Sequence, residues 1–160
     1  MKGKKEVQEK ATSYFCTKPS NFPKGRPYNC CETVLKTLAE QLGIESDLIP
    51  RIGTGIGASV SLNGLLCGSI CGAVMILGIE QGRNNPEEDP LKTWRMVDKF
   101  LDEFKQRFHH TTCRELTGVD VKTAEGMKKY VESIHDYSCA ERVRFTVEKT
   151  LEILDNRMIK

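Results

Sequence analysis

Three short segments of this chain share one pattern: a helix-capping residue, then cysteine, then any residue, then glutamate. The copies are residues 29–32 (Asn-Cys-Cys-Glu), 112–115 (Thr-Cys-Arg-Glu) and 138–141 (Ser-Cys-Ala-Glu). Asn, Ser or Thr with Glu three positions later is the capping-box pattern, in which both side chains bond backbone N–H groups that are free at a helix start. The pattern predicts three helices, each with a cysteine as its first helical residue.

A cysteine at a helix N-terminus lies beside free N–H donors and the positive end of the helix dipole. Both lower the pKa of the thiol and favour the thiolate, which binds metals and performs redox chemistry. We therefore expect Cys30, Cys113 and Cys139 to converge on one thiolate-rich site. Cys67 is the natural fourth ligand, because a helix that opens near Gly64 would hold it close to the first turn.

Composition restricts the class of protein. The chain has 160 residues, 39% hydrophobic and 29% charged, and can bury a core as one domain without disulfides. Its net charge of +2 is spread over interspersed acids and bases, so we expect no nucleic-acid partner. Residues 1–10 lack a signal-peptide core, and the apolar run 65–79 is shorter than the roughly 20 residues that span a bilayer. We expect a cytoplasmic protein with no membrane association.

Seven cysteines in a reducing compartment favour metal binding or catalysis over a disulfide framework. Cys31 and Cys71 fall on apolar helix faces, where packing is expected, and remain possible additional ligands. Cys16 receives no role. The three histidines are expected at caps or on the surface, and the absence of Cys-x-x-Cys-His excludes covalent haem.

Apolar residues recur at helical spacing, without the period-two alternation of strands. The helices predicted in this way cover residues 5–15, 29–42, 65–80, 90–109, 113–116, 124–133 and a final stretch after 138. They predict an all-α, single-domain compact bundle of about six to seven helices around a central Gly-rich apolar helix. Within the single domain 1–160, residues 1–28 form the N-terminal helix and a Pro/Gly loop, and 29–156 the four-cysteine redox core.

Three details of this fold can be checked. Gly64, Gly68 and Gly72 repeat every fourth residue and predict close approach of a neighbouring helix. Residues 53–58 match a Gly-x-Gly-x-x-Gly/Ala dinucleotide pattern, but without a preceding strand a packed loop is favoured. The inward-facing residues predicted for the two longest helices are Trp94, Val97, Leu101, Phe104 and Phe108, and Ala140, Val143, Val147, Leu151, Leu154 and Met158.

The order of these motifs resembles the C-GCAxxG-C-C family of redox-active proteins. The matching stretches are residues 29–35 (Asn-Cys-Cys-Glu-Thr-Val-Leu), 67–72 (Cys-Gly-Ser-Ile-Cys-Gly), 113–118 (Cys-Arg-Glu-Leu-Thr-Gly) and Cys139. The resemblance spans about residues 28–154 and implies that the family's four defining cysteines are Cys30, Cys67, Cys113 and Cys139, the set expected from the helix starts. Cys31 and Cys71 stand where the family usually has other residues. Related split-Soret cytochromes carry an iron–sulfur cluster, which favours that cofactor here.

Our first hypothesis is a redox or electron-transfer protein in which these four cysteines hold an iron–sulfur cluster, with [2Fe-2S] preferred over [4Fe-4S]. The second is a structural or carrier protein with a four-cysteine zinc site. The third is a thiol–disulfide protein that uses a close pair such as Cys67 and Cys71. Electron transfer implies a redox partner protein, and the glycine-lined helix faces favour a homodimer.

Overall fold

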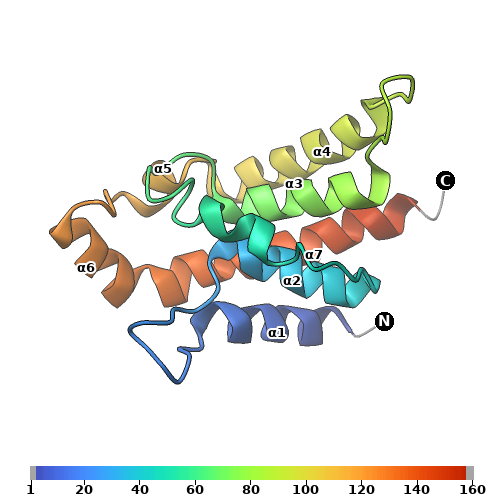
Figure 1. The fold of residues 1–160 in the computed structure, drawn as a ribbon. Coiled ribbons are helices and arrows are strands. Elements are labelled where there is room, and N and C mark those ends of the chain that lie inside the picture. The colour runs from blue at the N-terminus through green and yellow to red at the C-terminus, as the bar shows by residue number, and fades with distance from the viewer. Residues whose placement is uncertain (1–2, 158–160) are drawn as a thin grey trace.

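The computed structural model describes residues 3–157, and over this range the protein is all-α, as predicted (Figure 1). The elements in chain order are α1 (Lys4–Cys16), α2 (Cys30–Leu42), the 3₁₀ helix η1 (Arg51–Ile56), α3 (Gly68–Gln81), α4 (Leu91–Phe108), α5 (Cys113–Thr117), α6 (Ala124–Ser133), the π-helical turn η2 (His135–Cys139) and α7 (Ala140–Arg157). The only pairing of strand type within the described range is an isolated bridge between Leu66 and Thr112.

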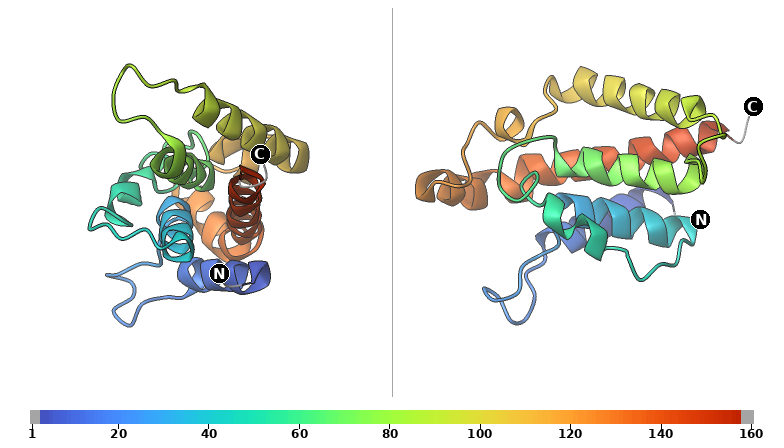
Figure 2. Two further views of the ribbon diagram at one scale, coloured as in Figure 1. Left: turned by 90° about the vertical axis from the view of Figure 1, so that its right-hand side faces the viewer. Right: turned by 45° about the horizontal axis from the view of Figure 1, so that its top comes forward.

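The five long helices lie side by side, and α5 and α6 extend from one end of the bundle (Figures 1 and 2). The last helix, α7, packs against α1, α2, α3 and α4, and α3 packs against α2, α4 and α7. The Gly-rich helix α3 therefore shares the centre of the bundle with α7. This arrangement places the N-terminal ends of α3 and α7 beside α5 and α6.

The predicted apolar faces of most helices form the core. Val143 and Val147 of α7 are fully buried, as are Val34 and Leu38 of α2. Met158, predicted on the inward face of α7, lies outside the described residues.

For α4 the predicted inward face is wrong at Trp94, whose side chain is 61% exposed. Phe104 is fully buried, as predicted, and so is Phe100, which was not predicted; these two residues define the face that packs on α3 and α7. Trp94 lies about 120° around the helix from Phe100, since each residue turns an α-helix by about 100°. The other residues of the predicted stripe, Val97, Leu101 and Phe108, are partly buried against the core, so the prediction fails at Trp94 and in its omission of Phe100.

Two glycines bring α3 against α2, as the four-residue repeat predicted. A Cβ added at Gly72 would lie 2.8 Å from Val34 Cβ, and one added at Gly68 would overlap the sulfur of Cys30. Only glycine allows the two helix backbones to come this close. The close approach brings Cys30 at the start of α2 beside the start of α3.

Helix α3 is rich in apolar residues, and it is buried within the bundle. Ile70, Ile76 and Leu77 are completely inaccessible to solvent. Across residues 3–157 no helix combines the length and apolar character needed to cross a bilayer.

Candidate functional site

Four cysteines from distant parts of the sequence line one small cavity at the end of the bundle where α5 and α6 lie. The cavity measures about 20 Å³, and its cysteines are Cys30, Cys67, Cys113 and Cys139. The remaining residues around it are Ala58, Ser69, Leu116, Thr117, Tyr130 and Arg142. The fold therefore brings together the four cysteines that were predicted as ligands; their binding of a metal or cluster stays a prediction.

Cys30 is the first residue of α2, as its capping box predicts. Asn29 Oδ1 accepts hydrogen bonds from the backbone N–H groups of Cys31 at 2.9 Å and Glu32 at 3.0 Å. Glu32 Oε2 in turn accepts from the Asn29 backbone N–H at 2.8 Å. These bonds satisfy the free donors of the helix start and fix the position of Cys30.

The glycine-rich segment after α2 supports this helix start. Its residues form η1, a packed 3₁₀ turn, and the dinucleotide pattern has no strand before it. Asn29 Nδ2 donates to the carbonyl oxygens of Gly53 at 3.3 Å and Thr54 at 3.2 Å. Thr54 Oγ1 donates to Glu32 Oε1 at 2.5 Å. The segment thus holds the capping residues of α2, in agreement with the packed loop favoured from the sequence.

Cys67 and Cys113 are held together by the backbone. Cys67 N–H donates to the Thr111 carbonyl oxygen at 2.8 Å, and Cys113 N–H donates to the Leu65 carbonyl oxygen at 2.6 Å. The antiparallel bridge between Leu66 and Thr112 lies between these two bonds. Cys67 and Cys113 lie 46 positions apart in the chain. These backbone bonds therefore fix them side by side at the starts of α3 and α5.

The helix-start positions of these two cysteines differ slightly. Cys113 is the first residue of α5, and Thr112 Oγ1 accepts from the Glu115 N–H at 3.2 Å. The Glu115 carboxylate accepts from the Thr112 hydroxyl at 2.6 Å, so only half of the predicted capping box forms. Cys67 is the N-cap residue of α3, one position before the helix.

The helix start predicted at Ser138 is wrong. Cys139 is the last residue of the π-helical turn η2, and its N–H donates to the Ile134 carbonyl oxygen at 3.1 Å. Ser138 Oγ donates to the same carbonyl at 3.4 Å and caps nothing. The helical path continues from η2 into α7, so the N–H groups that a cap would satisfy already have partners.

The expectation of lowered thiol pKa values is also wrong for this site. Burial raises the pKa of Cys113 to about 12 and that of Cys139 to about 11, and it raises the pKa of Cys30 well above its ordinary value. The neighbouring cysteines add to the effect on Cys30 and Cys113, because each thiolate repels the next. Desolvation and like charge outweigh the helix ends here. At neutral pH these three side chains are therefore neutral thiols unless a cation joins them.

The two cavity residues that hydrogen-bond Cys139, Arg142 and Tyr130, were not anticipated from the sequence. Arg142 lies one turn after Cys139, is 8% exposed and donates from Nη1 to Cys139 Sγ at 3.5 Å. Its charge opposes the rise in the pKa of Cys139 and of Cys113. Tyr130 of α6 hydrogen-bonds the Cys139 side chain, and burial raises the pKa of its hydroxyl far above the ordinary value. The Cys-x-x-Arg spacing at 139–142 is the sequence signal for Arg142; nothing in the sequence indicates Tyr130.

The other three cysteines do not line the cavity. Cys31 is fully buried with its sulfur facing Gly53, where an added Cβ would lie 3.1 Å away. Cys71 Sγ donates to the Leu66 carbonyl oxygen at 3.8 Å. Cys16 lies near Asp136, whose charge adds to the effect of burial and raises the pKa of this thiol. All seven cysteines are free thiols.

No histidine lines the cavity either. His109 ends α4 in a left-handed conformation with φ of 66°, which confirms the expected capping position. His135 stacks on Phe15 with the ring centres 4.1 Å apart. Over residues 3–157 no group of three or more His, Cys, Asp or Glu side chains is arranged to hold a metal ion.

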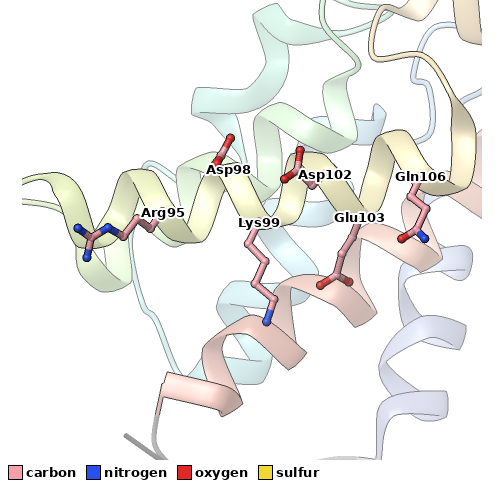
Figure 3. A pocket seen from close by; sticks show the side chains of 6 residues that line it. All are labelled: Arg95, Asp98, Lys99, Asp102, Glu103 and Gln106. Atoms are coloured by element: carbon pink, nitrogen blue, oxygen red, sulfur yellow. The ribbon is translucent and has the colours of Figure 1, made fainter.

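A larger hollow of about 600 Å³ lies along the outer side of α4 (Figure 3). It is lined by six polar residues of this one helix: Arg95, Asp98, Lys99, Asp102, Glu103 and Gln106. It shares no residue with the cysteine cavity. Its walls come from a single element, so it is a solvated helix face.

Comparison with known proteins finds a family model that matches most of the chain. The family model described as "Putative redox-active protein (C_GCAxxG_C_C)" matches residues 28–153, which include all four cavity cysteines. No curated protein and no solved structure matches the chain. The matched range begins just before α2 and ends within α7, so it leaves out α1.

Proposed function

Since the chain belongs to the C_GCAxxG_C_C family of redox-active proteins, we propose that Cys30, Cys67, Cys113 and Cys139 hold an iron–sulfur cluster for electron transfer. One observation carries the proposal: these four cysteines, from four distant segments, line one cavity. Four cysteine thiolates are the ordinary ligand set of [2Fe-2S] and [4Fe-4S] clusters. The donor set therefore fits the cofactor.

Charge supports the proposal as well. Burial and mutual repulsion raise the pKa values of Cys30, Cys113 and Cys139, so these three thiols keep their protons when no metal is bound. A cationic iron centre would offset the repulsion between the sulfurs, and loading it would release the thiol protons to solvent. Among the described residues that line the cavity, Arg142 is the one cationic side chain, and it would offset part of the remaining negative charge.

A single zinc ion and an iron–sulfur cluster make different demands on the spacing of the four sulfurs. Zinc bound by four cysteines needs every sulfur about 2.3 Å from one point. A cluster instead places its own iron and sulfide atoms between the ligand sulfurs. The cavity of about 20 Å³ favours the smaller [2Fe-2S] form, because it requires the least outward movement of the cysteine segments.

When bound, the cluster would supply one-electron transfer. The protein's residues would bind it through the sulfurs, screen it from water and donate hydrogen bonds to Cys139 from Arg142 and Tyr130. Electron transfer also requires a redox partner protein. A homodimer and a cytoplasmic location stay predictions.

The test is purification without oxygen, followed by measurement of iron, acid-labile sulfide and the visible absorption spectrum. We expect a coloured protein with iron and sulfide in comparable amounts. Cys113→Ser should lose most of the colour, because it removes a buried ligand. Cys16→Ser is the matched control and should keep it, because Cys16 lies outside the cavity.

Two other results would contradict the proposal and identify the alternatives. A colourless protein with one equivalent of zinc would indicate the four-cysteine zinc protein. A metal-free protein with a reversible two-electron thiol couple would indicate thiol–disulfide chemistry.

A further inference from the structure

We infer that Arg142 and Tyr130 are positioning residues that raise the reduction potential of the iron–sulfur centre by acting together on the sulfur of Cys139. This inference rests on the proposed function, since it concerns the centre that the four cysteines would hold. Neither residue belongs to the four-cysteine motif. Both line the cavity, and both hydrogen-bond the same cysteine.

Arg142 is a buried cation directed at the cavity. Its side chain extends from the first turn of α7, where Nη1 lies 3.5 Å from Cys139 Sγ and Nη2 donates to the Leu116 carbonyl oxygen at 2.6 Å. Its Nε is buried without a hydrogen-bond partner among the described residues. Burying a charged group without a compensating charge is costly. The negative sulfurs of the loaded centre are the compensation that the fold provides.

The bond to Leu116 gives Arg142 a fixed orientation. Leu116 belongs to α5, the short helix that begins with Cys113. Arg142 therefore links the segment of Cys139 to the segment of Cys113 and lies between two of the four ligands. A lysine at this position keeps the charge but cannot bond both the sulfur and the carbonyl in the same planar geometry.

Tyr130 approaches the same sulfur from α6. Its hydroxyl is a hydrogen-bond donor to Cys139, and its ring packs edge-on against His135 with centres 5.6 Å apart. The ring contact fixes the direction of the hydroxyl. Cys139 thus receives two side-chain hydrogen bonds, one of them from a cation.

The direction of the effect follows from charge. Reduction adds one negative charge to the centre, and a nearby cation and hydrogen bonds to a ligand sulfur stabilise that added charge. Removing either donor should therefore lower the reduction potential. Loss of Arg142 should have the larger effect, because it removes both a charge and a hydrogen bond.

The experiment is a redox titration of the loaded protein, followed by its visible absorption, for the wild type, Arg142→Met, Arg142→Lys and Tyr130→Phe. We expect Arg142→Met to reduce the equilibrium constant for reduction by about tenfold, which is about 59 mV for one electron. Arg142→Lys and Tyr130→Phe should each show a smaller decrease. Arg144→Met is the matched control and should leave the potential unchanged, because Arg144 contacts Thr12 of α1 at 3.5 Å.

The outcomes separate this inference from the proposed function. A wild-type protein without iron and sulfide overturns both. A loaded wild type with the same potential as Arg142→Lys and Tyr130→Phe overturns the inference alone. If Arg142→Met does not load or fold, these two milder variants decide the question by the sign of their shifts.

Discussion

Cys30 and Cys67 can share a cavity because the residue after Cys67 has no side chain. An added Cβ at Gly68 would overlap the sulfur of Cys30 and would lie 3.4 Å from the Cys31 backbone nitrogen. The glycine is thus part of the site although it has no functional group. Glycine is required at this position because α2 and α3 touch there, so its role depends on tertiary structure.

Gly68→Ala should therefore reduce the loading of the site and destabilise the protein by about 1–3 kcal/mol, the usual cost of overpacking. The measurements are iron content after anaerobic purification and the free energy of unfolding in urea. Gly78→Ala in the same helix is the control, because an added Cβ there meets nothing within 4 Å. It should gain about 0.5–1 kcal/mol from the lower backbone entropy of alanine. Equal effects of the two substitutions would contradict this role of Gly68.

At the level of single residues, the capping pattern predicted the helix start at Cys30 correctly and the one at Cys139 incorrectly. The Asn29 and Glu32 side chains cap α2 because Asn29, the residue before the helix, has an extended backbone. The segment that begins at Ser138 follows the same pattern of capping residue, cysteine, any residue and glutamate, but the chain before it is already helical. Capping depends on free N–H groups, and their presence is decided by the preceding segment.

Among the elements, the connection between η1 and α3 is the most unusual. Five consecutive residues that are not glycine, 58–62, have positive φ, between 35° and 71°. Left-handed backbone costs roughly 1–2 kcal/mol per residue with a side chain. Ser59 holds this turn with a hydrogen bond from Oγ to the Leu66 carbonyl oxygen, and Ala58 lines the cysteine cavity. The segment with this unfavourable backbone conformation therefore covers the candidate site.

Val60→Gly should stabilise the protein by up to about 1 kcal/mol, because β-branched valine is the least suited to φ of 40° and glycine adopts it freely. Val60 is 41% exposed, so little buried contact is lost. Thermal unfolding measures the effect. Val131→Gly is the control: this residue is 56% exposed within α6, and glycine there should lower stability by about 1 kcal/mol. A loss of stability at both positions would show that the turn is unstrained.

The same segment shows what helical periodicity does not predict. The apolar spacing identified the long helices, because their stability depends on one buried face. It could not give the left-handed turn, which a bond to Leu66 holds in place. The apolar spacing also placed Trp94 wrongly on the inward face of α4. Phe100 is buried there, because α3 and α7 pack on its side of the helix.

In the whole molecule, the cysteine cavity joins the starts of α2, α3, α5 and α7, which are separate parts of the fold. Without a centre, the neutral state of Cys113 and Cys139 contributes to stability, because ionisation is easier in the unfolded chain than in the folded one. The pKa values are about 12 and 11 when folded, against an ordinary value of 9.0. This contribution is complete below pH 9 and is lost as the pH rises through 11 and 12.

The free energy of unfolding of metal-free protein should therefore fall as the pH rises above about 9, as measured by urea denaturation under reducing conditions. The double variant Cys113→Ser, Cys139→Ser should show a weaker dependence, because it removes these two ionisations. Loaded protein should also depend less on pH in this range, because its ligand thiols have already lost their protons. An equal slope for the metal-free wild type and the double variant would contradict the prediction. The comparison would then assign the dependence to groups other than Cys113 and Cys139, and burial of these two sulfurs would not be what couples the site to the fold.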